Sequence, residues 1–249
     1  MVQSIILRKQ AWGEADELVG FLTRDLGWLA GVAKNSRKSR VRFGGHLEPL
    51  TLVDLTIRPR KKDTLVWIDD SNLVKGFTRV RSELLKVSWC SYFLELSSLL
   101  LPEASPEPEV FDFLLSFHDL LDTSDPGKFR LLLEEIRLLG LLGYGPQFYI
   151  CPACATGLDP GQDALFSPAT GGVCHLSCVD LDRERSVAIS PDTLAAVRKG
   201  LESGARVVDR LRLGNKGLGE LRRALSALVR HLRGADINSL TFLEKMGSW

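Results

Sequence analysis

The 249-residue sequence predicts an α+β protein of several domains: a small N-terminal β-barrel, a helical domain and a cysteine-rich module inserted into the helical part. Three observations predict this. Short β-favouring segments separated by turn residues fill the beginning of the chain, the apolar period becomes helical near Val80, and four of the five cysteines lie within residues 151–178. The expected domains are the barrel at 1–80, the helical domain at 81–147 and 183–249, and the inserted module at 148–182.

The barrel is predicted from five short segments with the composition of strands. In residues 18–33, two apolar runs flank Asp25-Leu26-Gly27, which is typical of a hairpin whose turn uses Gly27 at positive φ. Further β-type runs lie at residues 3–8, 50–57 and 64–69. Five antiparallel strands in so short a segment suit a small barrel, and OB-fold and SH3-like barrels share this pattern.

Two basic runs without acidic residues fall in loops expected between these strands. They comprise Lys34, Arg37, Lys38, Arg40 and Arg42 in the first run and Arg58, Arg60, Lys61 and Lys62 in the second. Flexible cations on barrel loops can neutralise phosphates without reading sequence, so the runs indicate a polyanion-binding surface; purely solvated loops are the alternative. Five nearby aromatic residues could stack on bases, although the core is the default expectation for each: Trp12, Phe21, Trp28, Phe43 and Trp67.

The helical domain is predicted from apolar positions at helical spacing. They occur in residues 81–101, 109–122, 128–143 and 218–233, with breaker-rich segments between the first three. Ser-Pro-Asp-Thr at Ser190 is a good start for a further helix. Cys90, in the middle of the first of these helices, is expected to be buried and inert, and His118 on an apolar helix face is expected in the core.

The net charge of +1 conceals a strong segregation of charge. Residues 1–80 carry a net charge of +5 and residues 198–233 one of +7, whereas residues 81–150 and 151–197 carry −6 and −4. On the helix at 218–233 the arginines fall within roughly 100° beside the apolar stripe. These cations could bind phosphates, and a solvated helix face is the alternative interpretation. The candidates for phosphate binding in this block are Arg198, Lys199, Arg206, Arg210, Arg222, Arg223, Arg230 and Arg233.

The cysteine spacing is typical of a tetrahedral Zn²⁺ site. Cys151-x2-Cys154 and, 19 residues later, Cys174-x3-Cys178 form two close pairs that can hold one ion from two turns separated by a hairpin. Four protein ligands leave no position for water, so the site would be structural and would stabilise a segment rich in Gly and Pro. His175-x2-Cys178 is also a valid spacing, so His175 is an alternative third ligand to Cys174. A thioredoxin-like redox pair at Cys151 and Cys154 is disfavoured because loop residues follow it.

The sequence contains no motif of a catalytic site. Walker, GxSxG, HExxH and GxGxxG motifs are all absent, and the four histidines are scattered. We therefore expect a protein without enzyme activity. No apolar run reaches about 18 residues, and the N-terminal apolar stretch is too short for a signal peptide, so neither a membrane span nor export is expected.

The order of these features resembles RecO, a bacterial family of recombination mediators, over nearly the full chain. The barrel motif matches at Glu14, Asp16, Leu18, Thr23, Gly27, Ala33-Lys34, Ser36-Arg37-Lys38-Ser39-Arg40 and Leu47-Glu48-Pro49. The most specific match is Leu141-Leu142-Gly143-Tyr144-Gly145-Pro146 leading into Cys151-x2-Cys154, followed by Phe166 and Gly171-Gly172. The chain departs from the family at Asn35, where the family has Gly, and at its second cysteine pair. The family spacing would place the third metal ligand at His175 rather than Cys174.

The resemblance implies an OB-fold barrel, a helical domain, an embedded zinc module and no enzymatic turnover. It implies a protein of the bacterial cytoplasm, associated with the nucleoid, that binds single- and double-stranded DNA and anneals complementary strands. The implied partners are RecR, single-stranded-DNA-binding protein and, indirectly, RecA, whose loading onto coated DNA such a protein assists. The alternative is a protein-interaction scaffold with structural zinc, whose main surface is the acidic helical middle.

Overall fold

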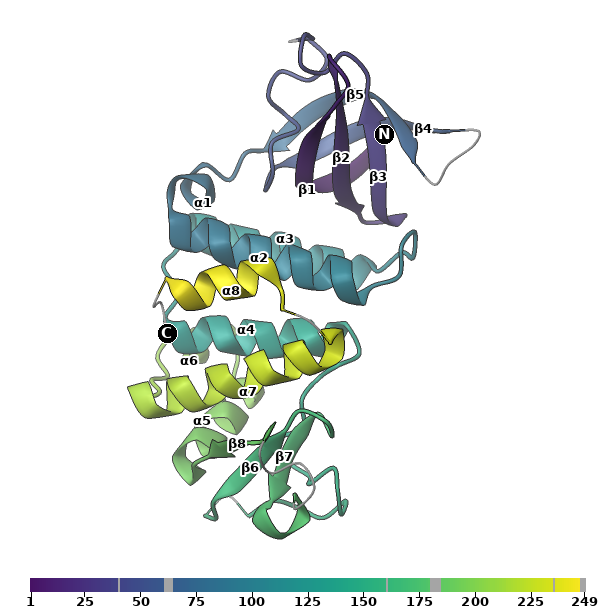
Figure 1. The fold of residues 1–249 in the computed structure, drawn as a ribbon. Helices are drawn as coiled ribbons and strands as arrows, with labels where there is room; N and C mark the ends of the chain where they lie inside the picture. Colours follow the sequence, from purple (N-terminus) through teal and green to yellow (C-terminus); the bar gives the residue numbers. More distant parts are fainter. Residues whose placement is uncertain (40, 61–64, 160, 180–184, 235, 247–249) are drawn as a thin grey trace. The chain divides into compact units, whose positions relative to one another are not determined.

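The structure, a computed structural model, describes residues 1–39, 41–60, 65–159, 161–179, 185–234 and 236–246, without the side chains of 205 and 206. The chain forms two compact units, Met1–Ser124 and Asp125–Trp249. The first unit holds a barrel and three helices, and the second holds the other helices and the cysteine-rich module (Figure 1). The division between the units therefore falls within the first part of the predicted helical domain, at 81–147.

The first five strands form a closed, OB-like barrel, as predicted. They are β1 (Val2–Trp12), β2 (Asp16–Thr23), β3 (Gly27–Ala33), β4 (Leu52–Pro59) and β5 (Val66–Lys75), arranged in the order β1-β2-β3-β5-β4. The predicted hairpin is β2–β3, and Gly27 in its turn has a φ of 72°. Neighbouring strands are antiparallel except β3 and β5, which run parallel, so the expectation of a wholly antiparallel barrel is corrected at this pair.

The barrel is filled by apolar side chains from alternate strand positions and from the segment before β4. They are Ile6, Val19, Phe21, Ala33, Phe43, Leu47, Val53, Leu55 and Ile68. Of the five aromatic candidates for base stacking, Phe21, Trp28 and Phe43 are buried, which confirms the core expectation for these three. Trp12 is 46% exposed and Trp67 is partly buried. Only the last two therefore present a surface to a ligand.

Three helices complete the first unit: α1 (Thr78–Ser82), α2 (Leu84–Leu100) and α3 (Pro108–Thr123). Stacking of Phe93 on Phe117, with ring centroids 4.1 Å apart, joins α2 to α3. Cys90 is fully buried, and burial raises the pKa of its thiol well above the usual value, as expected of an inert cysteine. His118 is also a core residue. Burial lowers its pKa to about 4, and its Nδ1 donates to the Leu114 carbonyl at 2.7 Å.

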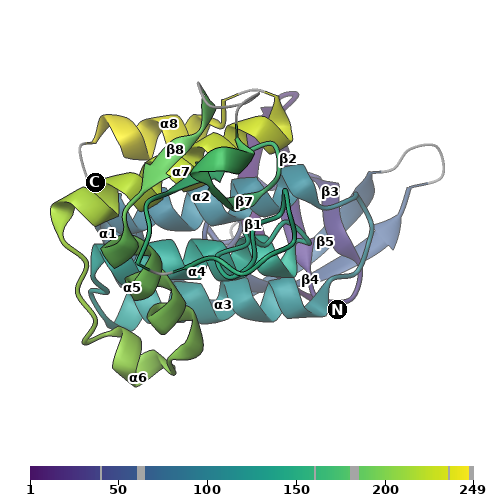
Figure 2. The same ribbon diagram turned by 90° about the horizontal axis from the view of Figure 1, so that it is seen from below.

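The second unit contains a three-stranded sheet and five α-helices among its described residues. The sheet has the order β7-β6-β8 and is formed by β6 (Ala164–Ser167), β7 (Gly172–His175) and β8 (Val187–Ile189), with the 3₁₀ turn η1 (Leu176–Cys178) after β7. The helices are α4 (Lys128–Leu141), α5 (Pro191–Glu202), α6 (Ala205–Val208), α7 (Asn215–Arg233) and α8 (Asn238–Lys245). α7 packs against α4 and α5 (Figures 1 and 2).

A buried ion pair joins two helices of this unit. Arg222 of α7 donates from Nη1 to Glu135 Oε2 of α4 at 2.6 Å and from Nη2 to Oε1 at 3.1 Å. Glu135 is fully buried and Arg222 is 4% exposed. Arg222 Nε donates to Ser226 at 2.9 Å, and Ser226 donates to Glu244 of α8 at 2.8 Å. The network therefore links α4, α7 and α8.

No helix in the described part of the chain has the length and apolarity to cross a membrane.

Candidate metal centre and nucleic-acid interface

Cys151 and Cys154 lie on a tight turn that follows α4 in the chain. The Cys151 N–H donates to the Thr156 carbonyl at 2.9 Å, and the Ala155 N–H donates to the Cys151 carbonyl at 2.8 Å. Ala155 completes the turn with a positive φ of 59°. Because the chain reverses within these few residues, the two thiols can face the same point.

The turn, the end of β7 and the 3₁₀ turn η1 bring four metal-ligating side chains together. The ligand atoms of Cys151, Cys154, His175 and Cys178 all lie within 4.8 Å of one another. His175 Nδ1 is 3.5 Å from Cys154 Sγ, while its Nε2 is 3.3 Å from the Gly157 carbonyl, to which it can donate. That second contact favours the tautomer whose Nδ1 lone pair points into the cluster. Three thiolates and one imidazole are a donor set that suits tetrahedral Zn²⁺.

The cluster contains His175, the alternative third ligand, in place of Cys174. Successive side chains of a strand point to opposite faces, and on β7 the Cys174 side chain is buried whereas that of His175 is partly exposed. The Cys174 thiol lies 3.4 Å from Thr170 Oγ1 and 3.9 Å from the Gly172 carbonyl. Burial raises the pKa of this thiol. The cluster therefore corrects the choice of Cys174 as third ligand to His175, although the Cys174 thiol also lies near that of Cys151.

Hydrogen bonds favour the ionised forms of two ligands. Burial opposes ionisation of Cys151, but the backbone N–H groups of His175, Cys154 and Ala153 lower the pKa of its thiol to about 6. The side chain of Thr156, 3.0 Å away, lowers the pKa of Cys154. Thiolates are the metal-binding form of cysteine, so the site is prepared for a cation.

No helix follows Cys151 and Cys154 in the described residues 155–159, which disfavours the thioredoxin-like interpretation of this pair.

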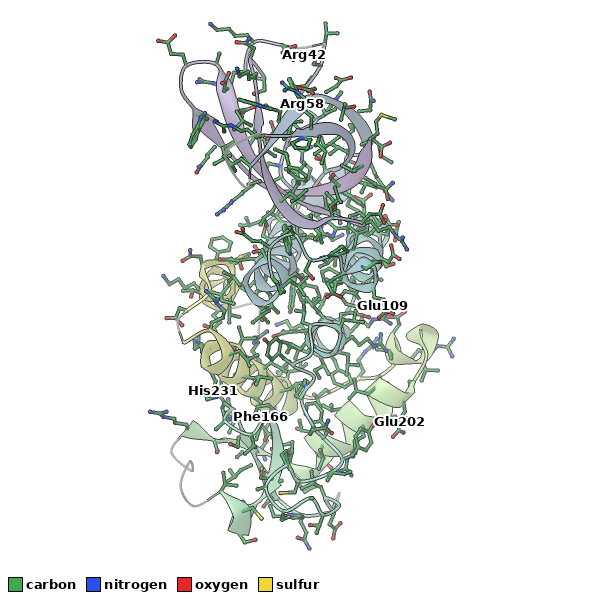
Figure 3. All side chains as sticks on the ribbon, turned by 90° about the vertical axis from the view of Figure 1, so that its right-hand side faces the viewer. Arg42, Arg58, Glu109, Phe166, Glu202 and His231 are labelled. Atoms are coloured by element: carbon green, nitrogen blue, oxygen red, sulfur yellow. The ribbon has the colours of Figure 1, made fainter. Side chains whose placement is uncertain are left out.

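Arg198, which the sequence suggested as a phosphate contact, holds the metal-binding turn against α5. Its Nε donates to the Phe148 carbonyl at 2.8 Å, and its Nη2 donates to the Leu158 carbonyl at 3.2 Å. The guanidinium also lies 5.3 Å from the ring centroid of Tyr149, whose hydroxyl donates to Glu202 at 3.1 Å (Figure 3 labels Glu202). The two carbonyls flank Cys151 and Cys154 in sequence, so Arg198 fixes both ends of the turn.

Replacing Arg198 with alanine should loosen the metal-binding turn. Hydrogen bonds from a charged donor contribute about 1.5–3 kcal/mol each, so amides of residues 148–158 should exchange hydrogen at least tenfold faster. Hydrogen exchange by mass spectrometry, with zinc release to a chelator measured alongside, checks this. Lys199→Ala is the matched control, because the neighbouring Lys199 side chain is exposed. Identical exchange in Arg198→Ala and the wild type would show that the turn does not depend on this arginine.

The structure corrects the arginine arc predicted on α7. The prediction is wrong for Arg222, which is buried against Glu135 and cannot reach a phosphate. Arg230 is paired with Asp236 at 2.8 Å and with Glu244 at 2.6 Å. The side chain of Arg206 lies outside the described residues. The candidates of this block that remain exposed are Lys199, Arg210, Arg223 and Arg233.

On the barrel, the first basic run is held beside the β1–β2 turn. The Arg37 N–H donates to the Ala15 carbonyl at 3.2 Å, and its Nη1 donates to the Glu14 carbonyl at 3.2 Å. The Asn35 N–H donates to Asp16 at 2.9 Å. Arg42 donates back to the Lys34 carbonyl at 2.9 Å. Lys34, Arg37 and Lys38 remain exposed in this arrangement, so the loop presents its cations from a fixed backbone.

Both basic runs meet at Trp67 of β5. Arg58 lies opposite Trp67 in the β4–β5 register, and Arg58, Arg60 and Lys34 all contact its ring. Arg58 is also paired with Asp69 at 2.8 Å, and Arg42 donates to the Asp69 carbonyl; Figure 3 labels both arginines on the barrel. Arg40, Lys61 and Lys62 lie outside the described residues. We call Lys34, Arg37, Lys38, Arg42, Arg58 and Arg60, with Trp67, the barrel basic surface.

Several residues of these sites carry no signal in the sequence. Thr156 and the Gly157 carbonyl, which contact Cys154 and His175, belong to no metal-ligand motif. Trp67 was one of five aromatic candidates, and nothing in its sequence context separated it from the buried ones. The contacts that distinguish it come from Lys34 and Arg60, which approach it from different loops.

Comparison with known proteins agrees with this architecture over the whole chain. The family model described as "Recombination protein O N terminal" matches residues 2–77, and "Recombination protein O C terminal" matches residues 81–241. The DNA repair protein RecO of Myxococcus xanthus (strain DK1622) is 33% identical over 246 residues, covering 98% of this chain and 96% of that protein. Those of Anaeromyxobacter sp. (strain K) and Syntrophus aciditrophicus (strain SB) are 30% and 29% identical, covering 98% of this chain and 95% of each relative. The chain therefore belongs to the RecO family of DNA repair proteins.

Proposed function

We propose that this chain is a DNA-binding recombination mediator without enzymatic turnover, which binds single- and double-stranded DNA and anneals complementary strands. The observation that carries the proposal is the convergence of two basic runs on the barrel basic surface. OB-fold barrels bind oligonucleotides with the loops between β1 and β2 and between β4 and β5. Arg37 contacts the first of these loops and Arg60 begins the second, so the cations lie at the expected place.

Annealing needs a second contact to nucleic acid or a surface that accepts two strands. The exposed cations Lys199, Arg210, Arg223 and Arg233 of the second unit support a second contact region. Cations that screen two phosphate backbones let base pairing drive annealing without a nucleotide cofactor. Membership of the RecO family supports extending the proposal to partners. We expect the chain to act with RecR in loading RecA onto DNA coated by single-stranded-DNA-binding protein.

The metal is proposed to be one structural Zn²⁺ per chain. Cys151, Cys154, His175 and Cys178 would hold it, and four protein ligands leave no place for a reactive water. The ion would supply folding energy to the loop between α4 and β6, which has no regular helix or strand among its described residues. The residues of the turn orient the ligands: Thr156 contacts Cys154, and Gly157 accepts from His175.

Neutralising the barrel loop tests the DNA-binding function. Changing Lys34, Arg37 and Lys38 together to alanine should weaken binding to every DNA sequence alike, because phosphate contacts carry no sequence information. On a single strand, each lost contact should flatten the log–log dependence of affinity on salt by about 0.7. Titrations of fluorescent oligonucleotides at several salt concentrations measure both effects.

The matched control removes the same charge elsewhere. Arg81, Lys128 and Lys245 are exposed cations outside both proposed DNA regions, and their triple alanine variant should keep the wild-type affinity and slope. Equal losses in the two triple variants would show a general effect of net charge. Unchanged binding in the loop variant would remove the barrel loop from the DNA interface. It would favour the interaction-scaffold alternative, for which Leu84, 59% exposed, and Leu85, 40% exposed, at the start of α2 offer an apolar surface.

A further inference from the structure

The Trp67 side chain on the barrel has an unusual set of neighbours. Lys34 Nζ lies 4.6 Å from its ring centroid, the Arg60 guanidinium carbon lies at 4.6 Å, and that of Arg58 lies at 5.6 Å. The indole is partly buried, unlike the core aromatic residues Phe21 and Phe43. The three cations come from the end of β4 and from two different loops. A ring on the outside of the barrel therefore lies at the centre of the surface that the proposed function assigns to phosphates.

We propose that Trp67 is the base-stacking platform of this barrel and gives it a preference for single-stranded over double-stranded DNA. This inference rests on the proposed DNA-binding function. In a duplex, both faces of each base are covered by its neighbours, so an indole ring gains nothing from them. An unstacked base of a single strand exposes a whole face, and every base has such a face, so the platform works without sequence preference.

The cation contacts explain how a ligand reaches the ring. A base–aromatic stack is stronger than an exposed cation–π contact, so a base can displace a cation from the ring. Two of the three cations, Arg58 and Lys34, differ in how firmly they are held. Arg58 is tied to Asp69 at 2.8 Å, whereas Lys34 is exposed and has no carboxylate partner within the described residues. Lys34 is thus the cation that moves aside, and it then lies next to the phosphate of the stacked nucleotide.

The platform predicts a coupling between the indole and the base that electrostatics alone does not produce. The full chain, as wild type and as Trp67→Leu, is titrated with oligothymidylate of about 15 nucleotides and with an abasic backbone of equal length. The wild type should bind the thymidylate about tenfold more tightly than the abasic strand, and Trp67→Leu should lose that difference. Affinity for the abasic strand and the salt slopes should not change, because no phosphate contact is removed.

Two further variants separate stacking from folding and from charge. Trp67→Phe keeps an aromatic ring and should retain most of the base-dependent affinity, and thermal unfolding checks that both Trp67 variants are folded. Lys34→Ala should weaken binding to the thymidylate, to the abasic strand and to a duplex together, and flatten the salt slope. Affinity of Trp67→Leu for a duplex of the same length should fall by less than about twofold.

The outcomes distinguish this inference from the function on which it rests. If the wild type binds both single strands equally in a salt-dependent manner, DNA binding stands and the platform is overturned. Equal weakening of Trp67→Leu on thymidylate, abasic strand and duplex also overturns it, because the indole would then only support the surface. If the wild type shows no salt-dependent binding to any of the three nucleic acids, the proposed function itself fails.

Discussion

Replacing Arg222 with alanine is expected to lower the free energy of unfolding of the second unit by about 3–5 kcal/mol. The change removes the bidentate cation partner of the fully buried Glu135, and breaking a buried ion pair from one side is far more destabilising than the loss of a surface ion pair. It also removes the donor to Ser226, through which the network reaches α8. Hydrogen exchange of the amides of α4 and α7 measures the effect within the second unit. Tryptophan fluorescence would report mainly on the first unit, which holds four of the five tryptophans, Trp12, Trp28, Trp67 and Trp89.

Two controls test the cause of this destabilisation. Arg223→Ala changes the adjacent, exposed arginine and should alter stability by less than about 0.5 kcal/mol. The double variant Glu135→Leu with Arg222→Met removes both charges while filling a similar volume, and it should recover much of the stability lost in Arg222→Ala. If Arg222→Ala were as stable as the wild type, the ion pair would not stabilise the contact between α4 and α7.

Replacing His175 with alanine is expected to release the metal from the purified protein, whereas Cys174→Ala should retain it. The cluster has four donors, and removing one opens a shell whose formation provides folding energy on the order of 10 kcal/mol in small zinc domains. Amides of residues 148–178 should then lose their protection from hydrogen exchange. Zinc content per chain by elemental mass spectrometry, together with competition by a chromogenic chelator, measures the difference between the two variants.

The opposite result is equally informative about the ligand set. Zinc lost in Cys174→Ala but kept in His175→Ala would restore the cysteine as third ligand. Cys151→Ser should behave like His175→Ala, because Cys151 belongs to the cluster with either third ligand. Full zinc occupancy in all three variants would mean that the cluster does not hold the ion. The DNA affinity of the metal-free variants should fall less than that of the barrel-loop variant, because the cluster lies in the other unit.

The barrel was predictable because its information is local. Alternating apolar residues define each strand, and Asp25-Leu26-Gly27 defines the β2–β3 turn, where Gly27 can adopt its φ of 72° without strain. The parallel pairing of β3 with β5 was not predictable, because hydrogen bonds between strands distant in sequence leave no periodic trace in either. The helix α8 and the strand β8 were missed because elements of three to eight residues are too short to show a period.

The metal site divides in the same way. Close spacing identified the two ligand pairs, since a two-residue gap confines the thiols to one turn. Choosing between Cys174 and His175 required the positions of both side chains relative to the other ligands, and these depend on the pairing of β7 with β6. Adjacent residues exchange faces when a strand is shifted by one position, so the spacing alone could not decide between them.

By itself, the sequence determined the element types, the position of the cysteine cluster and the two basic blocks, because periodicity, turn residues and charge are properties of neighbouring positions. Only the tertiary structure decided the role of each cation. Arg222 lies beside an apolar stripe whether it faces solvent or a partner, and its partner Glu135 is 87 positions away. Arg198 likewise contacts carbonyls 50 and 40 positions away. An arginine becomes a phosphate contact or a buried support according to which acceptors the packing brings within reach, and packing joins residues that the sequence keeps far apart.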